Sequence, residues 1–270
     1  MVTSFLFRAR PVHTVHAGLT LWRLDRAGEI LQWYREFLPG APEALYGFFG
    51  FKGVPRRAPF PPALQGERVC GVVWCYTGPA DGAEAAFRPV RALRPDFAHL
   101  GPMPFPTLQS LFNGLYPPGL QWYWRGEFLT ELGNAAIARH VEHGARAPTP
   151  LSLMHLYPVD GASGRVGRHA TAFSYREARW SLVIAGVDPD PANREAISAW
   201  SQAYWEAVHP CSAGGAYVNF LMDEGEARVR ATYRDNYDRL AAIKRQYDPD
   251  NLFRVNQNIP PTAGGEGGEP

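Results

Sequence analysis

The sequence predicts an α+β fold in which a mainly antiparallel β-sheet is covered on one face by helices, with a carboxy-terminal helix and an extended tail. Strand-like runs come in pairs and series, and amphipathic helical segments lie between them at intervals. The strict strand–helix alternation of a nucleotide-binding fold is missing, as are a GxGxxG turn after a strand and a phosphate loop. These three observations favour a layered α+β domain.

The expected strands are runs rich in β-branched and aromatic residues, bounded by turn residues. They cover residues 2–10, 13–22, 45–51, 69–78, 121–128, 150–158, 169–176, 179–187 and 216–222. The expected helices carry apolar residues at helical spacing and cover residues 26–38, 80–93, 108–112, 131–144, 191–208 and 224–246. Prolines interrupt the rest of the stretch from Pro95 to Pro118, which is therefore expected to be loop.

Composition excludes several classes of protein. Hydrophobic residues make up 46% of the chain and aromatic residues 13%, which indicates a well-packed globular protein. The formal charge is +1, so neither nucleic acid nor an anionic membrane is an expected partner. The three cysteines form no disulfide framework and favour a reducing compartment, so we expect a cytoplasmic protein. No apolar run reaches membrane-spanning length.

The segment 216–222, AYVNFLM, is the most informative for chemistry. If it is a strand, Tyr217 and Asn219 share one face, about 7 Å apart. Such polar groups need hydrogen-bond partners when they are buried, and a polar ligand facing them would provide these. The alternative is a purely structural role, with the tyrosine packed at the rim of the sheet and the asparagine in a turn.

The series from Ala170 to Ile259 resembles the end of the FAD-linked oxidase family that includes berberine bridge enzyme. Its pieces, in order, are ATAFSYR, VIAGVDPDP, a Trp-rich helix, AYVNF, NYDRLAAIKRQYDPDNLF and NQNI. The opening VTSFLFRARPV also resembles the last strand of that family's flavin domain. The resemblance implies four parts: a flavin-domain remnant (residues 1–12), a substrate-binding α+β domain (13–222), a berberine-bridge-like segment (223–260) and a disordered tail (261–270).

Several site roles follow from this resemblance. In such enzymes a substrate C–H gives its hydride to flavin while a base, often a tyrosine at the position of Tyr217, takes a proton from the adjacent O–H or N–H. Arg125 is a candidate for favouring the tyrosine anion and for lining the substrate cavity. The cofactor-binding candidates are the amides Asn219, Asn256, Gln257 and Asn258. Of the tail residues, Asn256 and Asn258 are favoured, since alternate residues of an extended segment point the same way.

Within YDPDN, Pro249 is expected to stop the helix while Asp248 and Asn251 build a turn that directs the tail back. His155 could reach the substrate cavity from its strand, although a core or rim histidine is the structural alternative. His140 and His143 are expected on a solvated helix face, and no metal site is expected.

The family's glycine-rich, His-bearing segment for FAD has no counterpart in the chain. We therefore expect the site for the adenosine and pyrophosphate of FAD to lie outside these residues. A truncated gene product, a domain split onto two chains and an excised fragment all remain open as explanations.

Two functions remain open. One is the substrate-binding half of an FAD-dependent oxidoreductase, inactive until a flavin domain completes it. The other is a non-catalytic solitary domain that binds a small molecule or a partner protein. In the second case, a homo-oligomer or the partner protein would cover the face that would otherwise contact flavin.

Overall fold

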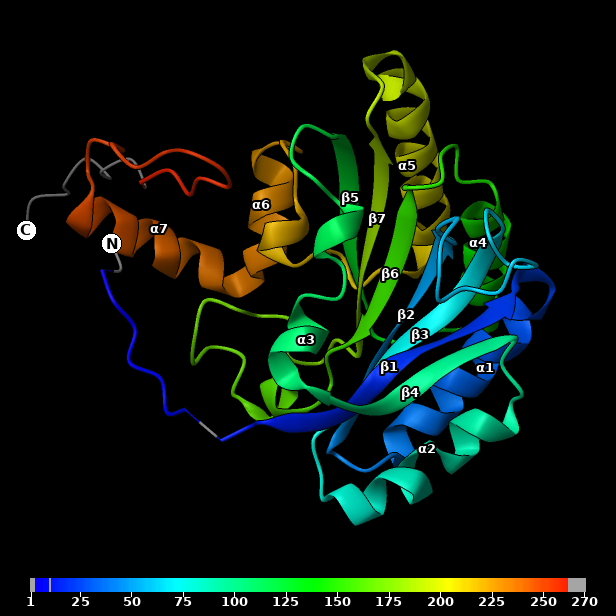
Figure 1. Ribbon diagram of the computed structural model, residues 1–270. Coiled ribbons are helices and arrows are strands. Elements are labelled where there is room, and N and C mark those ends of the chain that lie inside the picture. Colours follow the sequence, from blue (N-terminus) through cyan, green and yellow to red (C-terminus); the bar gives the residue numbers. More distant parts are fainter. Residues whose placement is uncertain (1–2, 10, 262–270) are drawn as a thin grey trace, which may run out of the picture.

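The computed structural model describes residues 3–9 and 11–261 and has a seven-stranded antiparallel sheet at its centre (Figure 1). The strand order is β4-β1-β3-β2-β6-β7-β5, and every pairing is antiparallel. The strands are β1 (Thr14–Arg23), β2 (Leu45–Gly53), β3 (Arg68–Tyr76), β4 (Phe97–Pro104), β5 (Gln121–Leu129), β6 (Leu153–Pro158) and β7 (Trp180–Asp188).

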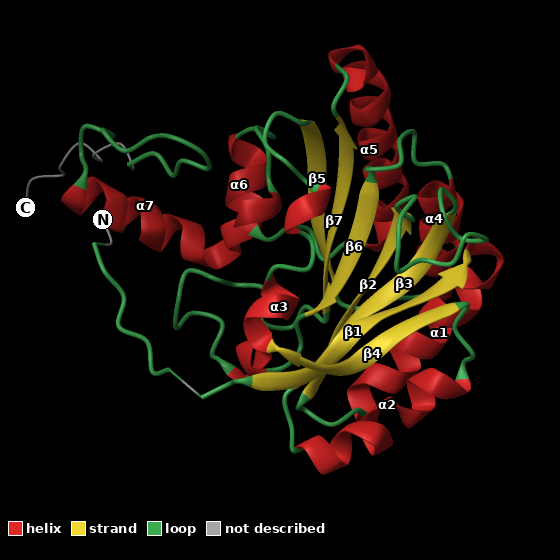
Figure 2. Ribbon diagram, in the orientation of Figure 1, coloured by secondary structure: helices red, strands yellow, loops and turns green. Residues whose placement is uncertain are grey.

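Helices cover one face of this sheet (Figure 2), which confirms the predicted α+β architecture. The covering helices are α1 (Ala27–Phe37), α2 (Ala83–Ala92), α4 (Asn134–Ala145) and α5 (Arg194–Val208). The others are α3 (Phe105–Gln109), α6 (Glu226–Tyr233) and α7 (Tyr237–Tyr247). We call the covered side the helix face and the opposite side the open face.

Alternation along the strands separates the two faces. In β2, Phe49 and Phe51 are buried on the helix face, while Phe48 and Lys52 are half-buried on the open face. The main core lies on the helix face, where the Tyr34 ring of α1 packs edge-on against Trp74. The Tyr34 hydroxyl donates a hydrogen bond to the Gly47 carbonyl at 2.6 Å, so this buried phenol is satisfied. Stability is thus concentrated on one side of the sheet.

Three expected strands are wrong. The described residues of 2–10 form no strand, and β1 begins at Thr14. Residues 169–176 form turns, and residues 216–222 contain a 3₁₀ turn at Val218–Phe220. All three have strand-like composition, but a strand also needs a neighbouring backbone to pair with, which composition does not specify.

The proline-rich middle of the chain also differs from expectation. Residues 97–104 form β4, which pairs only at the edge of the sheet, where the missing amides of Pro102 and Pro104 are tolerated. The short helix α3 begins at Phe105 instead of near Leu108. The long helix expected over 224–246 is interrupted at residues 234–236, where Arg234 has a φ of 47°. The expected disordered tail lies, from residue 262 on, outside the described residues.

Gly186 is where α5 approaches the sheet most closely. A Cβ there would lie 2.7 Å from the Ile197 Cβ and would meet the backbone of α5. We expect Gly186→Ala to lower the free energy of unfolding by about 1–3 kcal/mol, because the helix must move away from β7. Urea denaturation measures this, with Gly101→Ala as control because a Cβ at Gly101 meets nothing within 4 Å. Equal stability of the two variants would contradict this description of the α5–β7 contact.

Candidate functional site

The segment that carries Tyr217 crosses the open face at strand β5. Residues 213 and 215 pair with β5: the Phe128 amide donates to the Gly215 carbonyl, and the Ala213 amide donates to the Phe128 carbonyl, both at 2.7 Å. The chain then passes over Gly126, where a Cβ would lie 2.7 Å from the Phe220 Cβ. The absence of a side chain at Gly126 therefore allows this segment to lie directly on the sheet.

Tyr217 and Asn219 are brought together, although not by the expected strand. The 3₁₀ turn folds the segment so that Asn219 Nδ2 donates a hydrogen bond to the Tyr217 hydroxyl oxygen at 2.7 Å. The Tyr217 side chain remains 39% exposed, so it is available to a molecule outside the chain. Its ring packs edge-on against Phe220, and Phe220 packs against Tyr157 of β6. Tyr217 therefore borders an aromatic surface on the open face.

The closing segment NQNI returns to this same region. Gln257 Nε2 donates to the carbonyls of Leu221 and Met222, at 3.0 and 2.9 Å. Asn256 is exposed with a φ of 59°, and the backbone amide of Asn258 donates a hydrogen bond to the backbone carbonyl of Asn256 at 3.0 Å. The chain bends here, so the preference for Asn256 and Asn258, which assumed an extended segment, has no support from the backbone.

The turn in YDPDN forms as the sequence predicts. Helix α7 ends at Tyr247, and the Asp248 carboxylate accepts hydrogen bonds from the backbone amides of Leu252 and Phe253, at 2.7 and 3.0 Å. Lys244 contacts both Asp248 and the Phe253 carbonyl. These bonds redirect the chain toward the Tyr217 segment.

Arg125 is not brought to Tyr217. It follows the alternation of β5 onto the helix face, where its guanidinium pairs with Glu224 at 2.6 Å and lies 5.5 Å from the Trp205 ring centroid. It also donates to the Tyr123 hydroxyl at 3.1 Å. The sequence could place Arg125 on the strand, but the register that selects its face comes from pairing with β7.

Arg228, which the sequence did not single out, anchors the Tyr217 segment to the sheet. One of its nitrogens donates to the Gly126 carbonyl at 2.8 Å and to the carboxylate of Glu127 at 3.0 Å. Another donates to the Gly214 carbonyl at 3.3 Å. Glu127 is fully buried and also contacts His209 Nδ1 at 2.8 Å. A single arginine of α6 therefore joins the edge strand to the loop that leads to Tyr217.

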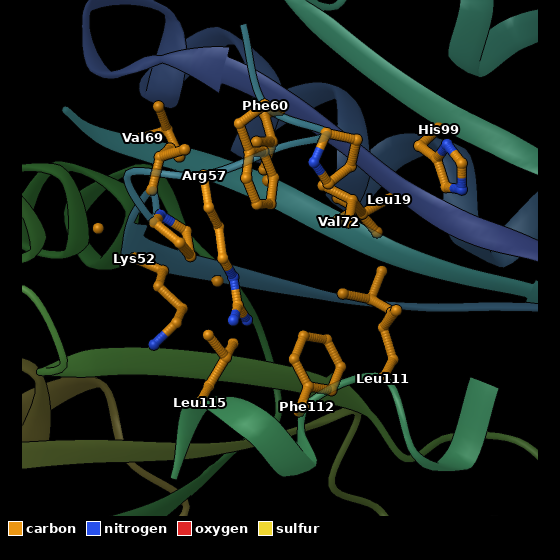
Figure 3. A pocket seen from close by; sticks show the side chains of 18 of the residues that line it. Leu19, Lys52, Arg57, Phe60, Val69, Val72, His99, Leu111, Phe112 and Leu115 are labelled. Atoms are coloured by element: carbon orange, nitrogen blue, oxygen red, sulfur yellow. The ribbon is translucent and has the colours of Figure 1, made fainter. Parts of the chain in front are cut away.

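A cavity of about 430 Å³ lies on the open face, over strands β1, β2 and β3 and beneath the segment 111–115 (Figure 3). His155 of β6 lines it, with its ring against Phe48 and its Nδ1 2.9 Å from the Tyr157 hydroxyl. Phe48 also contacts Tyr157, which in turn contacts Phe220. The cavity and the Tyr217 segment therefore border one continuous aromatic surface.

Burial changes the titration of the groups around this cavity. Desolvation, with a contribution from the charge of Lys52, lowers the pKa of His155 to about 3, so its imidazole is neutral at pH 7. Desolvation, with a smaller contribution from repulsion by Arg68, lowers the pKa of Lys52 to about 8. Lys52 Nζ donates to the Tyr116 hydroxyl and lies 4.5 Å from that ring's centroid.

His140 does not lie where the sequence predicts. His140 was expected on a solvated helix face but is fully buried, with Nδ1 2.8 Å from the Tyr204 hydroxyl. Desolvation, with a smaller contribution from the charge of His143, lowers the pKa of His140 to about 3.

Within residues 3–9 and 11–261, no group of three or more His, Cys, Asp or Glu is arranged to hold a metal ion. Nor does any helix of this part have the length and apolarity needed to cross a bilayer.

Known proteins resemble this chain both in the sequence around Tyr217 and in the fold. Residues 216–260 match the family model described as berberine and berberine like. Two relatives are an uncharacterized FAD-linked oxidoreductase, YgaK, of Bacillus subtilis (26% identical) and an FAD-linked oxidoreductase of Dictyostelium discoideum (23%). Each alignment covers 97% of this chain, and it covers 56% of the first relative and 55% of the second.

Solved structures share the fold. The BBE-like protein 28 of Arabidopsis thaliana superposes with a TM-score of 0.76 at 17% identity, covering 93% of this chain and 57% of that one. Berberine bridge enzyme of Eschscholzia californica gives 0.75 at 15% identity, covering 94% and 56%. The chain is therefore similar, in sequence and in fold, to the carboxy-terminal, berberine-bridge-enzyme-like part of these FAD-linked proteins, and it spans a little over half of their length.

The importance of Arg228 can be tested by Arg228→Met. This change leaves the buried Glu127 carboxylate with His209 alone, so we expect the free energy of unfolding to fall by about 3–5 kcal/mol. Arg146→Met is the control, because Arg146 pairs with Glu142 on the exposed surface of α4 and its loss is expected to cost about 0.5 kcal/mol or less. Similar losses in the two variants, measured by urea denaturation, would remove Arg228 from the anchoring role.

The pKa of Lys52 can be read by NMR of protein labelled with ¹³C-lysine, since Lys52 and Lys244 are the only lysines. Lys52→Met assigns the two signals. We expect the Lys52 Cε resonance to titrate near pH 8, because the ammonium is desolvated without a carboxylate partner. As the folded pKa is below the ordinary 10.5, the stability contributed by this group should rise between about pH 8 and 10.5. A midpoint near 10.5 would show that Lys52 is solvated.

Proposed function

We propose that this chain supplies the substrate-binding face and the general base of an FAD-dependent oxidoreductase that removes hydride from a substrate C–H. The observation that carries the proposal is the exposed Tyr217 hydroxyl held by the Asn219 amide on the open face. The family match over residues 216–260, which contains both residues, supports it. In this proposal the flavin-binding part is provided elsewhere, and the chain is not catalytic alone.

The residues of the open face suit a flavin ring. Tyr217 and Asn219 are exposed, so their polar groups can meet a second molecule. Gln257 holds the closing segment close to them through two backbone carbonyls, which leaves its own amide oxygen available. The ring edge of a flavin offers both carbonyl acceptors and an N–H donor, and amides supply partners of both kinds. Asn219 and Gln257 are therefore the proposed contacts, with Asn256 and Asn258 as further candidates.

FAD, held against the open face by Asn219 and Gln257, would supply the acceptor for the hydride that leaves the substrate carbon. The Tyr217 hydroxyl oxygen takes the proton from the adjacent O–H or N–H of the substrate, so that the carbon becomes doubly bonded to that atom. The Asn219 N–H points at this oxygen and stabilises negative charge on it. Phe220 packs against one side of the Tyr217 ring, and Tyr157 packs against Phe220 in turn. The cavity beside His155 holds the rest of the substrate.

A second candidate, a solitary domain that binds a partner, has one observation in its favour. Large apolar side chains are exposed near both ends of the described chain: Phe5, Leu6, Phe7, Leu252, Phe253 and Val255. The visible spectrum of the chain, purified after mixing with its flavin-binding part and FAD, separates the two candidates. Flavin absorption that co-elutes with the protein, or that is retained after FAD is added, favours the oxidoreductase. A colourless protein that FAD does not change, and that self-associates, favours the binding domain.

Tyr217→Phe tests the base. In the enzyme completed by its flavin-binding part, we expect single-turnover flavin reduction to slow by about 10² or more, because the substrate proton loses its acceptor. Tyr247→Phe is the matched control, since Tyr247 is 70% exposed on α7 and outside the proposed site. An unchanged reduction rate in Tyr217→Phe, with FAD still bound, would exclude Tyr217 as the base.

A further inference from the structure

The cavity on the open face has an unusual balance of charge. Its lining is mostly apolar, and its polar side chains are all basic or neutral: Lys52, Arg57, His99 and His155. No Asp or Glu occurs among the described residues that line it. Lys52 and Arg57 contribute the lysine and arginine cations of this lining, and burial keeps His155 neutral at pH 7 by lowering its pKa. An uncompensated pair of cations in an apolar cavity favours an anionic ligand.

Lys52 has no counter-ion in the part of the chain that the structure describes. It forms no ion pair with any described residue, and its contact is the hydroxyl of Tyr116. Burial raises the pKa of Tyr116, so this phenol carries no charge at neutral pH. Arg68 acts on Lys52 through its charge, and Arg57 and His155 line the same cavity; none of these three side chains supplies negative charge. A carboxylate entering the cavity would provide the missing charge.

Arg57 adds a second, more accessible cation. It is exposed at the rim of the cavity and makes no ion pair or side-chain hydrogen bond within the part of the chain that the structure describes. In Figure 3, Lys52 and Arg57 both direct their charged ends toward the side of the cavity formed by Phe112 and Leu115. A guanidinium matches a carboxylate with two parallel hydrogen bonds, whereas an alcohol or amine cannot use both.

We propose that this cavity binds an apolar carboxylic acid, with its body among the aliphatic and aromatic side chains and its carboxylate between Lys52 and Arg57. The volume, about 430 Å³, is that of a site for a small organic molecule. Assigning this acid as the substrate rests on the proposed function, whereas the binding itself does not. The open face would then select substrates by an acidic group remote from the C–H that Tyr217 addresses.

Three probes with one carbon skeleton test the proposal on the chain alone: 4-phenylbutyrate, 4-phenylbutan-1-ol and 4-phenylbutylamine, measured by calorimetry at pH 7 and low salt. The acid is expected to bind at least about tenfold more tightly than the alcohol, and the amine more weakly than either. Lys52→Met and Arg57→Gln should each reduce the affinity for the acid about tenfold and leave that for the alcohol unchanged. Arg56→Gln is the control, because Arg56 is the neighbouring arginine but does not line the cavity.

The pKa of Lys52, measured by NMR, should change on binding of the acid only if Lys52 contacts the carboxylate; a purely structural role of Lys52 would leave this pKa unchanged. Bound acid should raise the Lys52 pKa above about 8, toward 10.5, and bound alcohol should not. Equal affinities for acid and alcohol, no binding of the acid up to about 10 mM, or identical effects of Arg57→Gln and Arg56→Gln would each overturn the proposal. Because no flavin is involved, a failure here differs from a failure of Tyr217→Phe to slow flavin reduction.

Discussion

The placement of Tyr217 depends on one close approach, that of the segment 216–220 to strand β5 at Gly126. A side chain at this position would meet both the Phe220 backbone and the Ala216 side chain. Arg228 then holds the two partners together, since it bonds the Gly126 carbonyl and the buried Glu127. Edge strands usually leave backbone groups open to pairing, and here the loop 213–215 covers that edge. The same contact therefore closes the sheet and presents the phenol.

The two faces of the sheet have different tasks. The helix face carries the aromatic and aliphatic core that stabilises the fold, and the buried Tyr34 hydroxyl there is paired with the Gly47 carbonyl. The open face keeps an aromatic surface, a cavity with a desolvated lysine and a tyrosine that is partly exposed. Such features are costly for a face with no partner, which is why we assign binding and chemistry to this side.

Most of the layer architecture could be predicted from the sequence, because alternation and helical spacing are local signals. The strands around Phe49, Trp74 and Ile184, and the helix with Trp200 and Tyr204, form as those signals indicate. The errors occur where strand pairing, which composition does not specify, determines whether a segment becomes a strand. Strand β4 exists despite Pro102 because it lies at an edge, and residues 216–222 have strand composition but form a turn.

The candidate site was predictable to the same extent, because local features could be read from the sequence and contacts set by strand pairing could not. The sequence could indicate that Tyr217 and Asn219 belong together, and the structure joins them by a hydrogen bond across a 3₁₀ turn. The sequence could not indicate that Arg125 lies on the helix face, because a shift of one residue in the strand register exchanges the two faces of a strand. Arg228 and Lys52 were not singled out because their roles arise from contacts over a hundred and over sixty residues away along the chain. In the local sequence, Lys52 is a basic residue among apolar ones, and Arg228 is one of several arginines in a charged helix.

The most direct measurement is a crystal structure of this chain in complex with its flavin-binding part and FAD. The account predicts that the open face covers the isoalloxazine, with the Tyr217 hydroxyl still bonded to Asn219 and within about 3.2 Å of a substrate O–H or N–H placed beside the ring. A complex in which FAD contacts another surface, with Tyr217 remote from the ring, would contradict it.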